Sequence, residues 1–96
     1  MNAAQIKDFK FDEPVKYAIL QQIRDLPEKL RYTVRIALGL TEYGERDCIE
    51  LEVKSALKSM KNAGLVSSKL KHGWNGGAST KVCIWSLTPL GEEILK

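Results

Sequence analysis

The stretch from Asp47 to Val66, which reads DCIELEVKSALKSMKNAGLV, decides the fold of this chain. Its apolar residues recur at helical spacing and form one stripe, made of Ile49, Val53, Ala56, Leu57 and Met60. Asp47 and Glu50 have the spacing of a helix N-cap and its N3 partner, and Gly64 stands where a helix would stop. The pattern predicts one continuous helix over residues 47–63, with Leu57 and Met60 anchored in the core.

The period of the apolar residues changes after Gly64. Residues 66–71 are a short strand candidate, and residues 81–87 are a stronger one because they are rich in β-branched and aromatic side chains. The span between them, residues 72–80, contains three glycines, which predicts a mobile hairpin tip. We therefore expect an antiparallel hairpin over residues 65–88. Thr88 is expected to cap a short last helix that has Pro89 at its first position.

Two helices are expected upstream of this stretch. The first spans residues 14–26 and ends before Pro27, with Val15, Ala18, Ile19, Ile23 and Leu26 on its buried face. The second spans residues 28–38, with Gly39 as its C-cap. Its expected apolar stripe is Leu30, Val34, Ala37 and Leu38. Residues 40–46 are expected to be a loop.

The chain has 96 residues, which suits one domain over residues 14–96. Residues 1–13 are expected to be an N-terminal tail or dimerisation segment, because the apolar Ile6, Phe9 and Phe11 suit docking on this domain or on a second copy. There is no long apolar run and no signal-like N-terminus, so we expect no membrane association and a cytoplasmic location.

The net charge of +3 conceals an asymmetry between the two halves of the chain. Residues 1–52 carry eight Lys/Arg and ten Asp/Glu, whereas residues 53–96 carry seven Lys and two Glu. A basic half on a small domain suggests a polyanionic partner, with nucleic acid the first candidate. Lysine-rich surfaces also serve solubility, so the charge by itself does not identify the partner.

Helix, helix, helix, hairpin, helix is the layout of a winged helix-turn-helix: an α+β fold with a three-helix core, a two-stranded β-hairpin wing and a short C-terminal helix. Two segments, VKSALKSMKNAGLV over residues 53–66 and IWSLTPLGEEI over residues 84–94, resemble bacterial and archaeal winged-helix regulators of the MarR and PadR type. In those regulators the recognition helix ends in "L…GLV", a glycine-containing wing follows, and "W/Y-x-L-T-x-x-G" opens the closing helix. The resemblance covers residues 14–96.

The resemblance implies a prokaryotic or phage transcriptional regulator that binds double-stranded DNA sequence-specifically. The exposed face of the third helix would enter the major groove. The residues implied to contact DNA are Lys54, Ser55, Lys58 and Ser59 on this helix and Lys69, Lys71, His72, Trp74 and Lys81 on the wing. A homodimer is expected, because a two-fold symmetric operator requires two recognition helices. Its candidate surfaces are residues 1–11, the first helix and the last helix.

Acidic residues before and within the third helix favour an alternative to DNA binding. Glu42, Glu45, Asp47, Glu50 and Glu52 would repel phosphates, and capping explains only Asp47 and Glu50. A winged-helix adaptor that binds a basic protein and not DNA is therefore the alternative. A nucleic-acid-binding part of a replication or mobile-element machine would use the same surface as a regulator.

The sequence does not favour an enzyme or a cofactor site. It contains no P-loop, GxSxG or HExxH motif, and its single His lies in the glycine-containing span, so we predict neither catalytic residues nor a cofactor. Cys48 and Cys83 form no CxxC pair, and with one His they are too few for a structural zinc site. We therefore expect no metal, no disulfide, and two small buried thiols.

Overall fold

The computed structural model describes residues 3–75 and 78–96, without the side chains of residue 46 and residues 71–82. In this part of the chain, five α-helices, two short 3-10 helices and one antiparallel hairpin make an α+β fold. The elements are α1 (Ala3–Asp12), α2 (Pro14–Asp25), η1 (Glu28–Leu30), α3 (Thr33–Leu38), η2 (Thr41–Tyr43), α4 (Arg46–Asn62), β1 (Val66–Asn75), β2 (Ala78–Leu87) and α5 (Pro89–Ile94).

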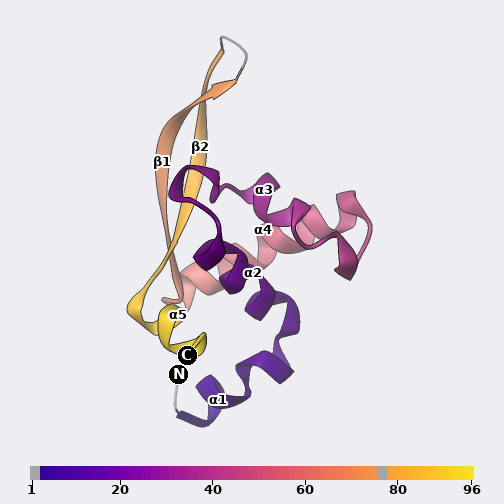
Figure 1. Cartoon of the computed structure of the whole chain (residues 1–96), viewed down its shortest axis with the longest axis vertical. Coiled ribbons are helices and arrows are strands. Elements are labelled where there is room, and N and C mark those ends of the chain that lie inside the picture. Colours follow the sequence, from indigo (N-terminus) through magenta and orange to yellow (C-terminus); the bar gives the residue numbers. More distant parts are fainter. Residues whose placement is uncertain (1–2, 76–77) are drawn as a thin grey trace.

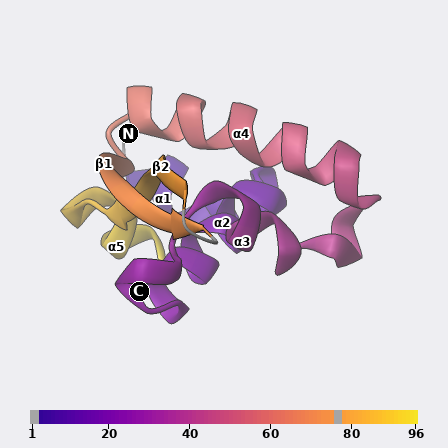
Figure 2. The same ribbon diagram turned by 90° about the horizontal axis from the view of Figure 1, so that it is seen from above.

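The hairpin extends away from the helices, as Figure 1 shows, and gives the molecule principal dimensions of 47 × 28 × 21 Å. Helix α1 lies at the end opposite the hairpin. Figure 2 shows α4 running along one side of the molecule. None of the helices in the described part of the chain has the length and hydropathy of a membrane span.

The core lies between α2, α3, α4 and the base of the hairpin. The stripe expected on the long helix is confirmed, since Ile49, Val53, Ala56, Leu57 and Met60 are all buried. The expected face of α2 is buried at Ala18, Ile19 and Ile23 and half-buried at its two ends, and the structure adds Leu20. Phe9 of α1 joins the same cluster, so the N-terminal segment docks on its own domain as a helix.

The predicted second helix is wrong in its first half. Residues 28–30 form a 3-10 turn, Tyr32 is extended, and α3 begins only at Thr33. Sheet pairing is the reason: Tyr32 bridges Ile84, and the Trp85 backbone N–H donates to the carbonyl oxygen of Arg31 at 2.8 Å. The indole N–H of Trp85 also donates to Thr33 Oγ1, at 3.1 Å.

The apolar stripe expected for this second helix changes accordingly. Val34 and Leu38 are 39% and 41% exposed, while Ile36 and Ala37 are buried. The later start turns α3 so that Ile36 faces the core. The expected loop over residues 40–46 contains the 3-10 turn η2, and Leu40 in front of it is buried.

A compact corner joins α4, the hairpin and α5. Gly64 has φ +81°, a left-handed conformation that glycine adopts without strain, and it turns the chain from α4 into β1. As predicted, Thr88 caps α5, because its Oγ1 accepts from the Gly91 N–H at 3.2 Å. The same hydroxyl donates to the carbonyl oxygen of Gly64 at 2.6 Å, and the Thr88 N–H donates to that of Leu65 at 3.2 Å. The corner therefore fixes how the hairpin leaves the helices.

Candidate nucleic-acid interface

The long helix α4 begins at Arg46, and its N-cap lies two residues before the one that its acidic residues predict. Glu45, and not Asp47, is the N-cap, and the Ile49 N–H donates to the Glu45 carbonyl at 2.8 Å. The Glu45 side chain makes no capping hydrogen bond. Asp47 instead lies in the first turn, where its carboxylate interacts favourably with the positive end of the helix dipole.

One edge of the exposed face of α4 is basic. Lys54, Lys58 and Lys61, spaced i, i+4 and i+7, share this edge, and all three side chains are exposed. Lys54 Nζ lies 3.8 Å from Glu50 Oε1, an i, i+4 ion pair that occupies part of its charge. Within the described residues, Lys58 makes no ion pair. Of the two lysines of α4 that were predicted to contact DNA, Lys58 is therefore the one whose charge is not compensated by a carboxylate.

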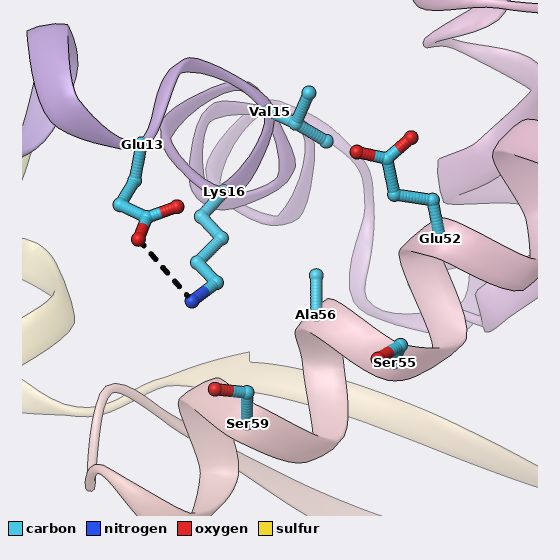
Figure 3. A pocket seen from close by; sticks show the side chains of 7 residues that line it. All are labelled: Glu13, Val15, Lys16, Glu52, Ser55, Ala56 and Ser59. Atoms are coloured by element: carbon cyan, nitrogen blue, oxygen red, sulfur yellow. Dashed lines mark ion pairs between the residues drawn. The ribbon is translucent and has the colours of Figure 1, made fainter.

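The other edge of the same face is polar and acidic. Figure 3 shows Glu52, Ser55 and Ser59 of α4 beside a shallow hollow of about 330 Å³ shared with the start of α2. Lys16 of α2 also lines this hollow, and its Nζ is 3.7 Å from Glu13 Oε1. All four helix residues predicted to contact DNA are exposed, but the structure separates the two serines from the two lysines.

Leu51 lies between the two edges, at the middle of the exposed face, and sequence analysis did not select it. Its side chain is 69% exposed. The sequence does carry the signal: Leu51 stands one full turn before Ser55 and two turns before Lys58, on the side opposite the buried stripe. An exposed apolar side chain among lysines and serines supplies the surface with an apolar contact.

The N-terminal end of α4 has the opposite charge from its C-terminal half. Glu42, Glu45 and Asp47 are all exposed there, together with Tyr43, which is 46% exposed. From residue 53 to its end, α4 contains lysines and no acidic residue. The helix is therefore polarised along its length, acidic at its start and basic towards the hairpin.

The hairpin carries the remaining predicted contacts. Its register pairs Lys69 with Ile84, Lys71 with Val82 and His72 with Lys81. Lys69 is exposed on β1, and so is Leu70, at 67%. The side chains of Lys71, His72, Trp74 and Lys81 lie outside the described residues, as do residues 76–77 of the expected glycine-containing tip.

Both cysteines are free thiols, and they differ in how far they are buried. Cys83 is half-buried against the core, but Cys48 is exposed, because it lies on the outer side of α4. The expectation of two buried thiols is thus wrong for Cys48. In the residues searched, which exclude the masked positions, no group of three or more His, Cys, Asp and Glu side chains is placed to hold a metal ion.

Comparisons of this chain with protein-family models, with curated proteins and with solved structures found no match.

Proposed function

We propose that this chain is a winged helix-turn-helix protein that binds double-stranded DNA in the cytoplasm and regulates transcription. The observation that carries the proposal is the row of exposed lysines at Lys54, Lys58 and Lys61 on α4, next to a hairpin that projects from the body and carries Lys69 (Figure 1). Helix and hairpin together offer two basic surfaces on one small domain.

The dimensions of α4 suit a major groove. Its 17 residues make a helix of about 25 Å, and a groove about 12 Å wide admits one helix. In the proposed complex, Lys54 and Lys58 bind phosphates, and Ser55 binds either phosphates or base edges. Leu51, at the middle of the face, supplies an apolar contact suited to the methyl group of thymine.

The acidic start of α4 determines which part of the helix makes the contact. A recognition helix normally reads bases with its N-terminal residues, yet Glu45 and Asp47 are exposed there and would repel phosphates. We therefore propose that DNA lies against the middle and the C-terminal half of α4 and against the hairpin. The same charge gradient complements the helix dipole and therefore stabilises α4 in the absence of DNA. A binding experiment distinguishes this stabilising role from DNA binding.

The hairpin is proposed to act as the wing and to contact the neighbouring backbone or minor groove. Lys69 is the described residue that supports this role, and Lys71, His72, Trp74 and Lys81 remain predicted contacts. We propose a homodimer, since pairing gives a domain of this size two recognition helices for a two-fold symmetric site.

The test is a gel shift with a random 30-bp duplex at several salt concentrations. If about three lysines per protomer meet phosphates, a dimer gives a log–log salt slope of about −5, because each contact contributes about −0.9. The matched control replaces Lys54, Lys58, Lys69 and Lys71 by Ala, with circular dichroism to confirm that it folds. Absence of binding at low salt, or equal binding by this variant, contradicts the proposal.

A protein-binding adaptor is the second candidate, and the start of α4 is the observation that favours it. Tyr43 is an exposed aromatic side chain, and the exposed Glu42, Glu45 and Asp47 stand within four residues of it in the chain. An apolar surface with acidic neighbours suits a basic segment of another protein. In that case the duplex is not bound at low salt, and replacing the three acidic residues by Gln or Asn has no effect on any DNA assay.

A further inference from the structure

One face of α1 is left uncovered by the rest of the chain. The helix docks on the domain through Ile6 and Phe9. The opposite side carries Ala4, Lys7, Asp8 and Phe11 at spacings of i, i+3, i+4 and i+7, which place them in one stripe. All four are exposed, and Phe11 is the most exposed large apolar residue that the structure describes, at 79%.

This stripe is complementary to itself. When two such helices lie antiparallel, with a two-fold axis between Lys7 and Asp8, Ala4 of one copy faces the partner's Phe11. Lys7 then faces the partner's Asp8, and the symmetry repeats both contacts. The small side chain of Ala4 leaves room for the aromatic ring, and each lysine meets a carboxylate. In the described part of the chain neither Lys7 nor Asp8 has an ion pair that this arrangement would break.

We propose that two copies of this chain pair through their α1 helices, antiparallel, with Phe11 packed against the partner's Ala4 and Lys7 paired with the partner's Asp8. A C2 interface requires one surface that matches itself, and the order Ala4, Lys7, Asp8, Phe11 meets this requirement. The mixed charge of the stripe suits neither an anionic membrane nor a nucleic acid, both of which select a basic surface.

The size of the surface predicts the strength of the dimer. Two ten-residue helices bury less than the roughly 1,200 Å² of a stable interface, so this contact by itself is weak. We expect a dissociation constant of about 100 µM, with monomer and dimer in exchange. The inference specifies the surface of the homodimer in the proposed function, and it does not require that the chain bind DNA.

Charge reversal tests the pairing without DNA. Sedimentation velocity of the full chain, from about 10 to about 500 µM, spans the expected dissociation constant. Lys7→Asp sets two carboxylates opposite each other, and Asp8→Lys sets two ammonium groups opposite each other, so each variant by itself stays monomeric. A 1:1 mixture of the two forms a heterodimer, because both pairs are then attractive, and the double variant K7D/D8K dimerises like the unmodified chain.

Two further variants separate the interface from general effects. Phe11→Ala weakens the dimer about tenfold. Lys29→Asp makes the same charge change as K7D but on the exposed turn η1, and it leaves the dimer intact. Circular dichroism checks that every variant is folded.

Three results overturn the inference: an unmodified chain that is monomeric at 500 µM, a dimer that tolerates both single reversals, or a mixture that does not associate. A gel shift on the same proteins keeps the two proposals apart. An unmodified chain that binds duplex but forms no dimer in sedimentation refutes only this inference, whereas absence of any shift at low salt refutes the DNA-binding proposal and leaves the sedimentation result unaffected.

Discussion

The buried and the exposed faces of α4 differ in how strongly the rest of the molecule constrains them. On the buried face, Val53 and Leu57 have no exposed surface, and α4 packs against α2, α3 and β1. On the exposed face, Lys58 and Leu51 contact mostly solvent. The first face is constrained by packing, and the second is free to vary with a partner. The comparison teaches that stability and binding can be changed separately within one helix.

The largest effect is expected on the buried face. Leu57→Ala removes a side chain with 0% exposure and leaves a cavity, so the free energy of unfolding should fall by about 2–5 kcal/mol. Lys58→Ala, one residue along on the exposed face, should change it by less than about 0.5 kcal/mol. Urea unfolding of both variants measures the difference. Equal midpoints would mean that α4 is rotated about its axis from the orientation described.

The corner beyond α4 offers a second test of packing. A Cβ at Gly91 would overlap the carbonyl oxygen of Leu65, so Gly91→Ala must displace backbone and should cost about 1–3 kcal/mol. Gly44→Ala is the matched control, because its backbone is extended and a Cβ there meets nothing within 4 Å. Thermal unfolding compares the two. A Gly91→Ala variant as stable as Gly44→Ala would contradict the close approach at this corner.

On the exposed face, salt dependence measures each lysine. Lys58→Ala should weaken duplex binding and flatten the log–log salt slope by about 0.9 for each protomer bound. Glu50→Gln should strengthen binding, because it releases Lys54 from its ion pair. Lys10→Ala on α1 makes the same charge change far from the hairpin and should leave the slope unchanged. If Lys10→Ala and Lys58→Ala flatten the slope equally, the binding depends on net charge and not on the position of Lys58.

The smallest effect concerns Leu51. If this side chain contacts a thymine methyl group, the protein should prefer an alternating A·T duplex over the same duplex with uracil by about fourfold, from about 0.8 kcal/mol for one buried methyl-sized group. Leu51→Ala should bind both duplexes equally. Lys58→Ala should weaken both by the same factor and keep the preference. Competition gel shifts measure the ratio of the two affinities for each protein. If the unmodified protein binds the thymine and uracil duplexes equally, Leu51 does not contact a thymine methyl group.

Sequence analysis predicted the parts of the site that depend on one element. The periodicity of α4 correctly separated Leu57 from Lys58, since a helix places residues on faces by spacing alone. The prediction did not separate Lys54 and Lys58, on the basic edge of the exposed face, from Ser55 and Ser59 on the polar edge. Ser59 lines the hollow only because α2 begins beside it, with Glu13 and Lys16, and no spacing within α4 contains that information.

By itself, the sequence determined the long helix and its buried stripe, the turn at Gly64, the cap at Thr88, and the strands over residues 66–71 and 81–87. Each of these depends on residues a few positions apart, where backbone preference and side-chain spacing act directly. The expected tip over residues 72–80 is wrong where the structure describes it, because strand pairing continues to Asn75 and resumes at Ala78. Only the tertiary structure decided that Tyr32 leaves the expected helix to bridge Ile84, and that α3 starts at Thr33, whose hydroxyl accepts a hydrogen bond from the Trp85 indole. Those contacts join residues about fifty positions apart, and a backbone group that can bond either within a helix or to a strand follows whichever partner the packed core brings within reach.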